Sequence, residues 1–145
     1  MLTLLAPGEA ITATTSKSAS GHGVPLAFEI GQPHIIVTLA RIGMTEAEVR
    51  ATGKPALIGT RLMTRVGRAV EKGESLGFMK VLVDAESKLI LGASLLGVGC
   101  DEAIHCLLDV MYAKAPYTTI SHAVHIHPTV AELIPTLLQS LQPLE

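Results

Sequence analysis

Aromatic residues are scarce in this 145-residue chain, which holds no tryptophan, two tyrosines and two phenylalanines. Few rings are therefore available for stacking the bases of a single-stranded nucleic acid. Basic charge is also in short supply, because 11 Lys and Arg residues face 13 Asp and Glu residues and the net charge is −2. Nothing in this balance attracts a phosphate backbone. We expect no nucleic-acid partner.

Long apolar runs are absent as well, and none approaches the ~18 residues that a membrane span needs. The first ten residues lack the basic start of a secretory signal peptide. The only cysteines, Cys100 and Cys106, lie six positions apart in or beside one predicted helix, on different faces. We expect buried, reduced thiols and a cytoplasmic protein without a membrane partner.

Charged residues are few, at 17%, whereas apolar residues make up 48% and the mean hydropathy is +0.45. A chain of this length usually forms one domain and is large enough to bury a core. We interpret the shortage of surface charge as a sign of surface that is meant for a partner.

The chain divides near residue 33. Residues 1–33 contain a small polar tract, TATTSKSAS, and a GHG tripeptide, which favour an N-terminal arm of disordered or loosely packed chain. Residues 34–145 carry sharper signals for a folded domain. We expect strands at 35–38, 56–64, 78–84 and 89–97, on the basis of their β-rich apolar runs.

The connections between these runs are predicted from their polar residues. AESK (85–88) is a hairpin connection between the last two strands, and the charged, glycine-punctuated segment 68–77 is interpreted as a loop. TEAE (45–48) is a capping box that starts a short helix, with Gly53 as its stop.

The remaining helices follow from periodicity and capping. The clearest spans 101–114, where Ile104, Leu107, Leu108 and Met111 form one apolar stripe. A short helix at 118–124 is predicted with Thr118 or Thr119 as its cap. The last helix is expected to begin near Thr129, with Pro135 kinking it or shifting its start. This order predicts an α+β domain in which an antiparallel β-sheet carries helices on one side.

The stretch HIHPTVAE (125–132) carries the candidate chemistry. Pro128 fixes its own φ and moves His127 away from helical geometry. Glu132 then has two interpretations: it completes a capping box on the backbone of Thr129, or it turns back to His127 and orients the imidazole. Under the second interpretation, the two side chains lie within hydrogen-bonding reach and His127 stays partly exposed to solvent.

The sequence suggests two other kinds of site. His122, His125 and His127 form a histidine cluster, which is a weak zinc signal without a second cluster or cysteines. The GVGCDE stretch (97–102) has no third glycine at the spacing of a dinucleotide fingerprint. We therefore assign neither metal-binding nor cofactor-binding residues.

These segments together resemble the C-terminal dimerisation domain of the pyridine nucleotide-disulfide oxidoreductases, which include glutathione reductase, dihydrolipoamide dehydrogenase and mercuric-reductase-like flavoproteins. RIGMTEAEVR (41–50) resembles the segment that follows the first strand of that domain, and 63–97 resembles its central sheet. The helix at 101–114 corresponds to its long helix and HPTVAE (127–132) to its terminal signature. The resemblance covers residues 34–143.

The resemblance implies roles for two residues. His127 would be the catalytic acid/base partner of redox-active thiols in the other subunit of a homodimer, and Glu132 would be hydrogen-bonded to it. The peptide bond before Pro128 is often cis in this family. FAD and NAD(P) are implied for the complete enzyme, but this sequence lacks the two domains and the cysteine motif that lie upstream in full-length members.

We therefore expect a truncated or separately encoded dimerisation domain that is inactive alone. Its partner would be a second copy or a flavin- and nucleotide-binding chain. Two alternatives stay open at this point. One is a non-catalytic self-association module, and the other is a small metal-binding protein that uses His122, His125 and His127.

Overall fold

The computed structural model describes residues 3–6, 9–12, 26–29 and 36–145, with side chains from Thr38 onward. Its strands are β1 (Thr3–Ala6), β2 (Glu9–Thr12), β3 (Leu26–Glu29), β4 (Ile36–Gly43), β5 (Ala56–Leu62), β6 (Phe78–Asp84), β7 (Ile90–Gly97) and β8 (Gln142–Pro143). Its α-helices are α1 (Glu46–Ala51), α2 (Gly67–Glu71), α3 (Cys100–Ala103), α4 (His105–Tyr112), α5 (Thr118–Ser121) and α6 (Leu133–Gln139), and a 3₁₀ turn spans Met63–Arg65.

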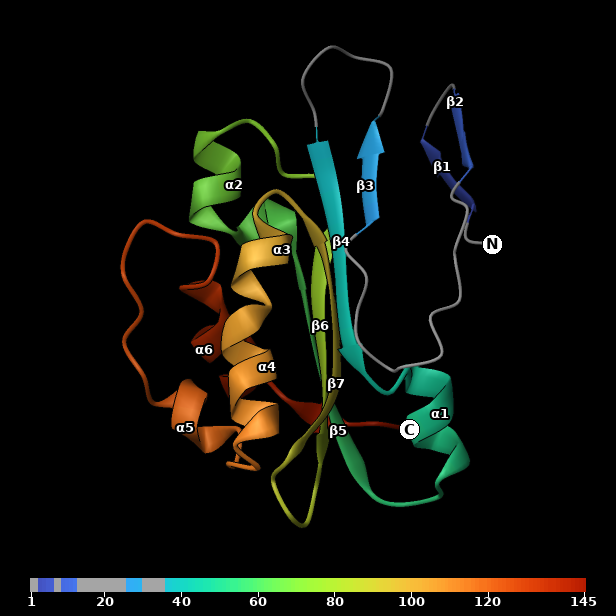
Figure 1. Ribbon diagram of the computed structural model, residues 1–145, viewed down its shortest axis with the longest axis vertical. Coiled ribbons are helices and arrows are strands. Elements are labelled where there is room, and N and C mark those ends of the chain that lie inside the picture. The colour runs from blue at the N-terminus through green and yellow to red at the C-terminus, as the bar shows by residue number, and fades with distance from the viewer. Residues whose placement is uncertain (1–2, 7–8, 13–25, 30–35) are drawn as a thin grey trace.

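A six-stranded sheet in the order β3-β4-β7-β6-β5-β8 forms the centre of the molecule, and β1 and β2 form a separate two-stranded sheet (Figure 1). Every pairing between the described strands is antiparallel. The β6–β7 hairpin confirms the predicted connection at 85–88, where the Asp84 carboxylate accepts the N–H groups of Glu86 and Ser87 at 2.9 and 2.7 Å. An acidic side chain at the start of a turn supplies such bonds readily.

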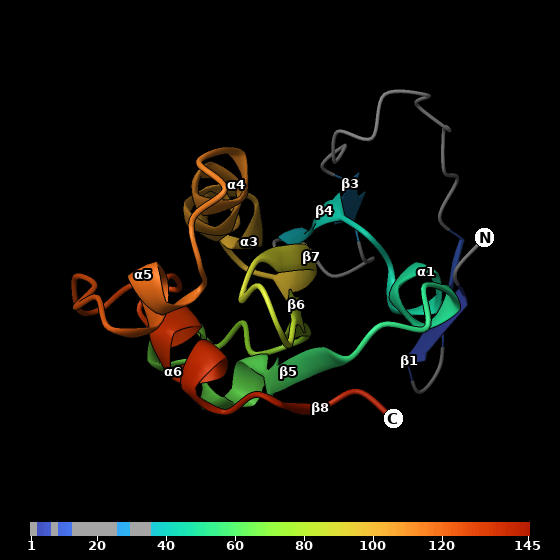
Figure 2. The ribbon, with the colours of Figure 1, turned by 90° about the horizontal axis from the view of Figure 1, so that it is seen from below.

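Helices α2 to α6 lie on one face of this sheet, and α1 lies on the other (Figures 1 and 2). Alternate residues of β6 point to the helical side, so that Met79, Val81 and Val83 are fully buried there. Leu107 of α4 and Leu137 of α6 complete this main core with no exposed surface. The α+β class and the helical layer on one side are thus confirmed.

Helix α1 covers one corner of the opposite face. Val49 is buried there in a small cluster with Ala56 and Leu82. The predicted capping box is present: the Thr45 hydroxyl accepts the Glu48 N–H at 3.1 Å, and the Glu48 carboxylate accepts the Thr45 N–H at 2.7 Å. Gly53, the predicted stop, follows the helix with a φ of +65°.

Three sequence predictions on the segments of helices α2 to α5 were wrong. Segment 68–77 is not all loop, because its first residues belong to α2, which buries Ala69 completely. The predicted helix at 101–114 is divided at Ile104, where the Leu107 N–H bonds to a carbonyl three residues back instead of four. Helix α5 ends at Ser121, and no side chain caps it at the predicted Thr118 or Thr119.

Most of the N-terminal arm predicted over 1–33 lies outside the described residues, and its disorder stays a prediction. Within it the structure describes β1, β2 and β3, of which β3 pairs with β4. None of the helices in the described part of the chain has the length and apolar character needed to cross a bilayer.

Candidate functional site

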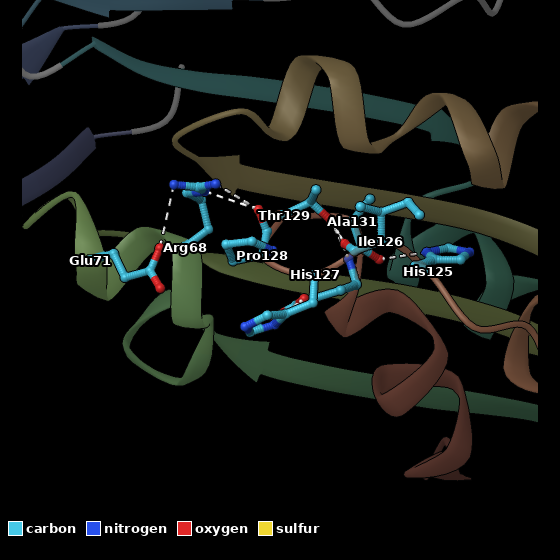
Figure 3. A network of polar contacts seen from close by, with 9 residues as sticks. Arg68, Glu71, His125, Ile126, His127, Pro128, Thr129 and Ala131 are labelled. Carbon is cyan, nitrogen blue, oxygen red and sulfur yellow. Dashed lines mark hydrogen bonds and ion pairs between the residues drawn. The ribbon is translucent and has the colours of Figure 1, made fainter.

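The chain between α5 and α6 forms a tight corner with His127 at its tip (Figure 3). The His127–Pro128 peptide bond is cis, as the family resemblance suggested. The His127 side chain is 77% exposed, whereas that of Glu132 is 15% exposed. The corner thus presents an imidazole to the surroundings beside a largely sheltered carboxylate.

The imidazole and the carboxylate are hydrogen-bonded. His127 Nδ1 lies 2.8 Å from Glu132 Oε2, which confirms the predicted pairing within one chain. Because an ionised carboxylate only accepts hydrogen bonds, the ring nitrogen that faces it carries the proton. The neutral ring then has its lone pair on Nε2, which has no hydrogen-bond partner among the described residues. This arrangement suits proton exchange at Nε2.

Thr129 explains why Glu132 is available for this pairing. Its hydroxyl donates to the Ile126 carbonyl at 2.7 Å and accepts the Glu132 N–H at 3.2 Å. The hydroxyl half of the predicted capping box is therefore present, but the carboxylate half is wrong, since that group bonds to His127. Helix α6 accordingly begins at Leu133 instead of Thr129, with Pro135 in its first turn.

Two side chains hold the corner by its backbone carbonyl groups. Arg68 of α2 donates from Nε at 3.1 Å and from Nη2 at 2.8 Å to the carbonyl of Pro128. The ring of His125 places Nδ1 2.9 Å from the carbonyl of Ala131. Sequence reasoning missed Arg68, because it is 60 residues from its partner and lies in a segment interpreted as a loop.

The metal-site alternative finds no support in this geometry. Within residues 38–145, no three His, Cys, Asp or Glu side chains come together as a possible metal-binding group. His125 instead bonds to a backbone carbonyl and His127 to a carboxylate, so His122, His125 and His127 do not form a ligand set.

The two cysteines are not candidates for redox chemistry. Both are free, and burial raises the pKa of the Cys100 thiol to about 12 and that of the Cys106 thiol to about 11. A thiol reacts as its thiolate, so both are poor nucleophiles near neutral pH. Cys100 is fully buried and Cys106 is half-buried, in line with the expectation of inert, reduced thiols.

FAD and NAD(P), which the family implies, do not fit the described residues. A dinucleotide is held by a glycine-rich loop between a parallel strand and a helix N-terminus. All described strand pairings are antiparallel, so the described part of this chain contains no such unit.

Comparisons with known proteins place this chain in a family. Residues 34–138 match the profile of the dimerisation domain of pyridine nucleotide-disulphide oxidoreductases. Dihydrolipoyl dehydrogenase 2 of Haloarcula marismortui is 34% identical over 116 residues, which are 77% of this chain and 25% of that protein. The probable pyridine nucleotide-disulfide oxidoreductase RclA of Escherichia coli is 34% identical over 94 residues, which are 65% of this chain and 21% of that protein.

A solved structure of a flavoprotein disulfide reductase has a similar fold. The HOCl-induced flavoprotein disulfide reductase RclA from Escherichia coli matches with a TM-score of 0.72 at 29% identity, over 82% of this chain and 26% of that one. The chain spans about a quarter of the length of the relatives that it matches. It belongs to the pyridine nucleotide-disulphide oxidoreductase family, whose dimerisation domain it carries.

Proposed function

We propose that this chain serves as the dimerisation domain of an FAD-dependent, NAD(P)-linked disulfide oxidoreductase and supplies His127 to the redox site of the partner subunit. The observation that carries this proposal is the 2.8 Å contact between His127 Nδ1 and Glu132 Oε2 at an exposed corner. A merely structural histidine would not need a sheltered carboxylate and a free Nε2 at the tip of a projecting turn.

The residues of this chain would manage a proton. Nε2 of His127 would accept the proton of a thiol in the partner's cysteine pair, which leaves a thiolate and an imidazolium. Glu132 would stabilise the positive charge of that ring and hold it in one orientation. On the reverse step the same nitrogen would return the proton to sulfur. In the complete enzyme the flavin and the nicotinamide supply the electron transfer.

The surface around His127 supports a partner in contact with it. Val124 is 97% exposed and Ile126 is 78% exposed, on the same turn. Large apolar side chains at such exposure are commonly covered by a second molecule. A homodimer would cover them by symmetry and would bring each His127 to the other subunit. The two free thiols also fit a reducing compartment such as the cytoplasm.

A chimera tests the proposal. Residues 34–145 of this chain would replace the matching quarter of RclA, and NAD(P)H-dependent disulfide reduction would be measured. His127→Gln and Glu132→Gln should each lower kcat, the former by ~10²–10⁴-fold, because general acid–base help has that size. His122→Gln, on the same connection but outside the hydrogen-bonded pair, is the matched control and should keep the activity.

The alternative of a self-association module without redox chemistry makes a different prediction. Under that alternative, the chimera would form dimers, but the chimera with His127→Gln would reduce the disulfide substrate as fast as the unmodified chimera. Such a result would contradict the proposed function while leaving the dimerisation role intact.

A further inference from the structure

Helix α2 touches the His127 corner at two places. Its second residue, Arg68, holds the Pro128 carbonyl with two donors. Its first residue, Gly67, lies alongside Glu132, whose Oε1 is 3.7 Å from the position that a Cβ on Gly67 would occupy. Glu132 therefore lies beside this short helix. His127 is the residue before Pro128, whose carbonyl group the helix holds through Arg68.

We propose that Arg68 is a positioning residue for His127, a proposal that rests on the acid–base role given above. Pro128 directly follows His127, so a fixed Pro128 carbonyl fixes the backbone from which the imidazole projects. At the other end of the turn, His125 holds the Ala131 carbonyl, one residue before Glu132. The corner is thus held on both sides of the pair, and Figure 3 shows Arg68 and His125 at its opposite ends.

The guanidinium group suits this task better than an ammonium group would. One carbonyl oxygen has two lone pairs, and Nε and Nη2 of Arg68 reach it from one rigid plane at 3.1 and 2.8 Å. The remaining Nη1 lies 3.4 Å from Glu71 on the next turn of the helix, which keeps the plane oriented. A lysine could offer a single, mobile donor at this place.

The isolated chain allows a direct test through the tautomer of His127. Under mildly alkaline conditions imidazole rings are neutral, and ¹⁵N NMR distinguishes a proton on Nδ1 from one on Nε2. The unmodified chain should show the Nδ1–H form, because Glu132 accepts that proton. In Arg68→Met, the ratio of Nδ1–H to Nε2–H should fall about fivefold, since a loosened corner weakens one hydrogen bond. In Arg68→Lys, the ratio should lie between the values of the unmodified chain and Arg68→Met.

Arg50→Met is the matched control. Arg50 also pairs with a carboxylate along a short helix, at 2.9 Å from Glu46, but it belongs to α1 on the opposite face of the sheet. It should leave the tautomer ratio unchanged. A ratio in Arg68→Met equal to that of the unmodified chain, with the fold retained by circular dichroism, overturns the proposal. If Arg68→Met does not fold, Arg68→Lys decides: a ratio at the unmodified value overturns the proposal, and a lowered ratio supports it.

The chimera separates this inference from the proposed function. Arg68→Met should lower kcat about fivefold with KM unchanged, and should have no further effect when His127 is already Gln. An effect of equal size on both backgrounds would overturn the positioning role alone. Loss of activity in His127→Gln would still support the acid–base role, whereas full activity in His127→Gln would overturn the proposed function whatever Arg68 does.

Discussion

The two cysteines and His127 lie in sharply different environments. Cys100 is enclosed by the main core and its thiolate would be desolvated, which raises the pKa of the thiol to about 12. Cys106 is half-buried and also bonds through Sγ to the Ala103 carbonyl at 3.2 Å. His127, by contrast, is 77% exposed, and its Nδ1 is hydrogen-bonded to Glu132. Of these three side chains, the imidazole is the most exposed to solvent.

Both cysteines should resist alkylation in the folded chain. The raised pKa values leave very little thiolate near neutral pH, so iodoacetamide labelling followed by mass spectrometry should be slow until a denaturant is added. The stability that comes from neutral thiols is fully present below pH 9, the ordinary value, and is lost as the pH rises towards 11 to 12. Labelling of Cys100 at the rate of a free thiol would show that the core is open.

Glu132 illustrates what the local sequence could and could not predict about the site. The TVAE pattern indicated a capping box and the HPT corner indicated a pair with His127, and both readings used real contacts. Thr129 does accept the Glu132 N–H, but the carboxylate is turned to His127. The choice depends on the path of the chain around Pro128, whose carbonyl oxygen accepts two hydrogen bonds from Arg68, 60 residues away. A contact with a residue so far away in the sequence cannot be predicted from the eight residues of the HIHPTVAE stretch alone.

At the scale of elements, a glycine of β7 lets the α1 connection lie against the sheet. A Cβ on Gly92 would collide with the backbone carbonyl oxygen of Met44, the residue that joins β4 to α1. Met44 also donates its N–H to the Leu91 carbonyl at 2.9 Å. The backbones meet here without room for a side chain, as glycine in a strand often indicates.

Gly92→Ala should therefore destabilise the domain more than Gly67→Ala. The first change forces the Met44 backbone away from the sheet, at a cost of roughly 1–3 kcal/mol in the free energy of unfolding. The second places a methyl group at an ordinary contact distance, 3.7 Å from Glu132 Oε1. Urea unfolding followed by circular dichroism measures both. Equal midpoints for the two variants would contradict this account of how α1 docks.

Elements with a strong local pattern were predictable, and those held by tertiary burial were not. The β6–β7 hairpin and the capping box of α1 are encoded by apolar runs and polar end residues. Helix α2 is five residues long with a glycine at its start, and local propensity does not favour it. It exists because Val66 and Ala69 are fully buried against the core. Burial here overrides a charged, glycine-rich sequence.

At the scale of the whole molecule, apolar side chains remain exposed on the face that carries the His127 corner. Val124 and Ile126 precede His127 on that turn, and Val70 of α2, the helix that carries Arg68, is 55% exposed. Such exposure is expected in a chain with 48% apolar and only 17% charged residues. A second copy of the domain would remove such surface from water.

The isolated chain should therefore self-associate. Sedimentation at micromolar concentration should give a dimer, and Ile126→Asp should weaken the association about tenfold or more, as expected for a buried apolar contact that gains a charge. Lys54→Asp, an exposed change on the far connection between α1 and β5, serves as the control and should leave the dimer intact. A clean monomer in the unmodified chain would contradict the proposed assembly.

The most direct test of the central claim uses mixed dimers of the RclA chimera. One subunit would carry His127→Gln with intact upstream cysteines, and the other would carry an intact His127 with those cysteines changed to serine. Two affinity tags would select the mixed species. If His127 serves the partner subunit, mixed dimers should recover about half the activity of the unmodified chimera, because one of their two sites holds both a thiol pair and an imidazole. Mixed dimers as inactive as either parent, in a chimera that is otherwise active, would contradict the claim.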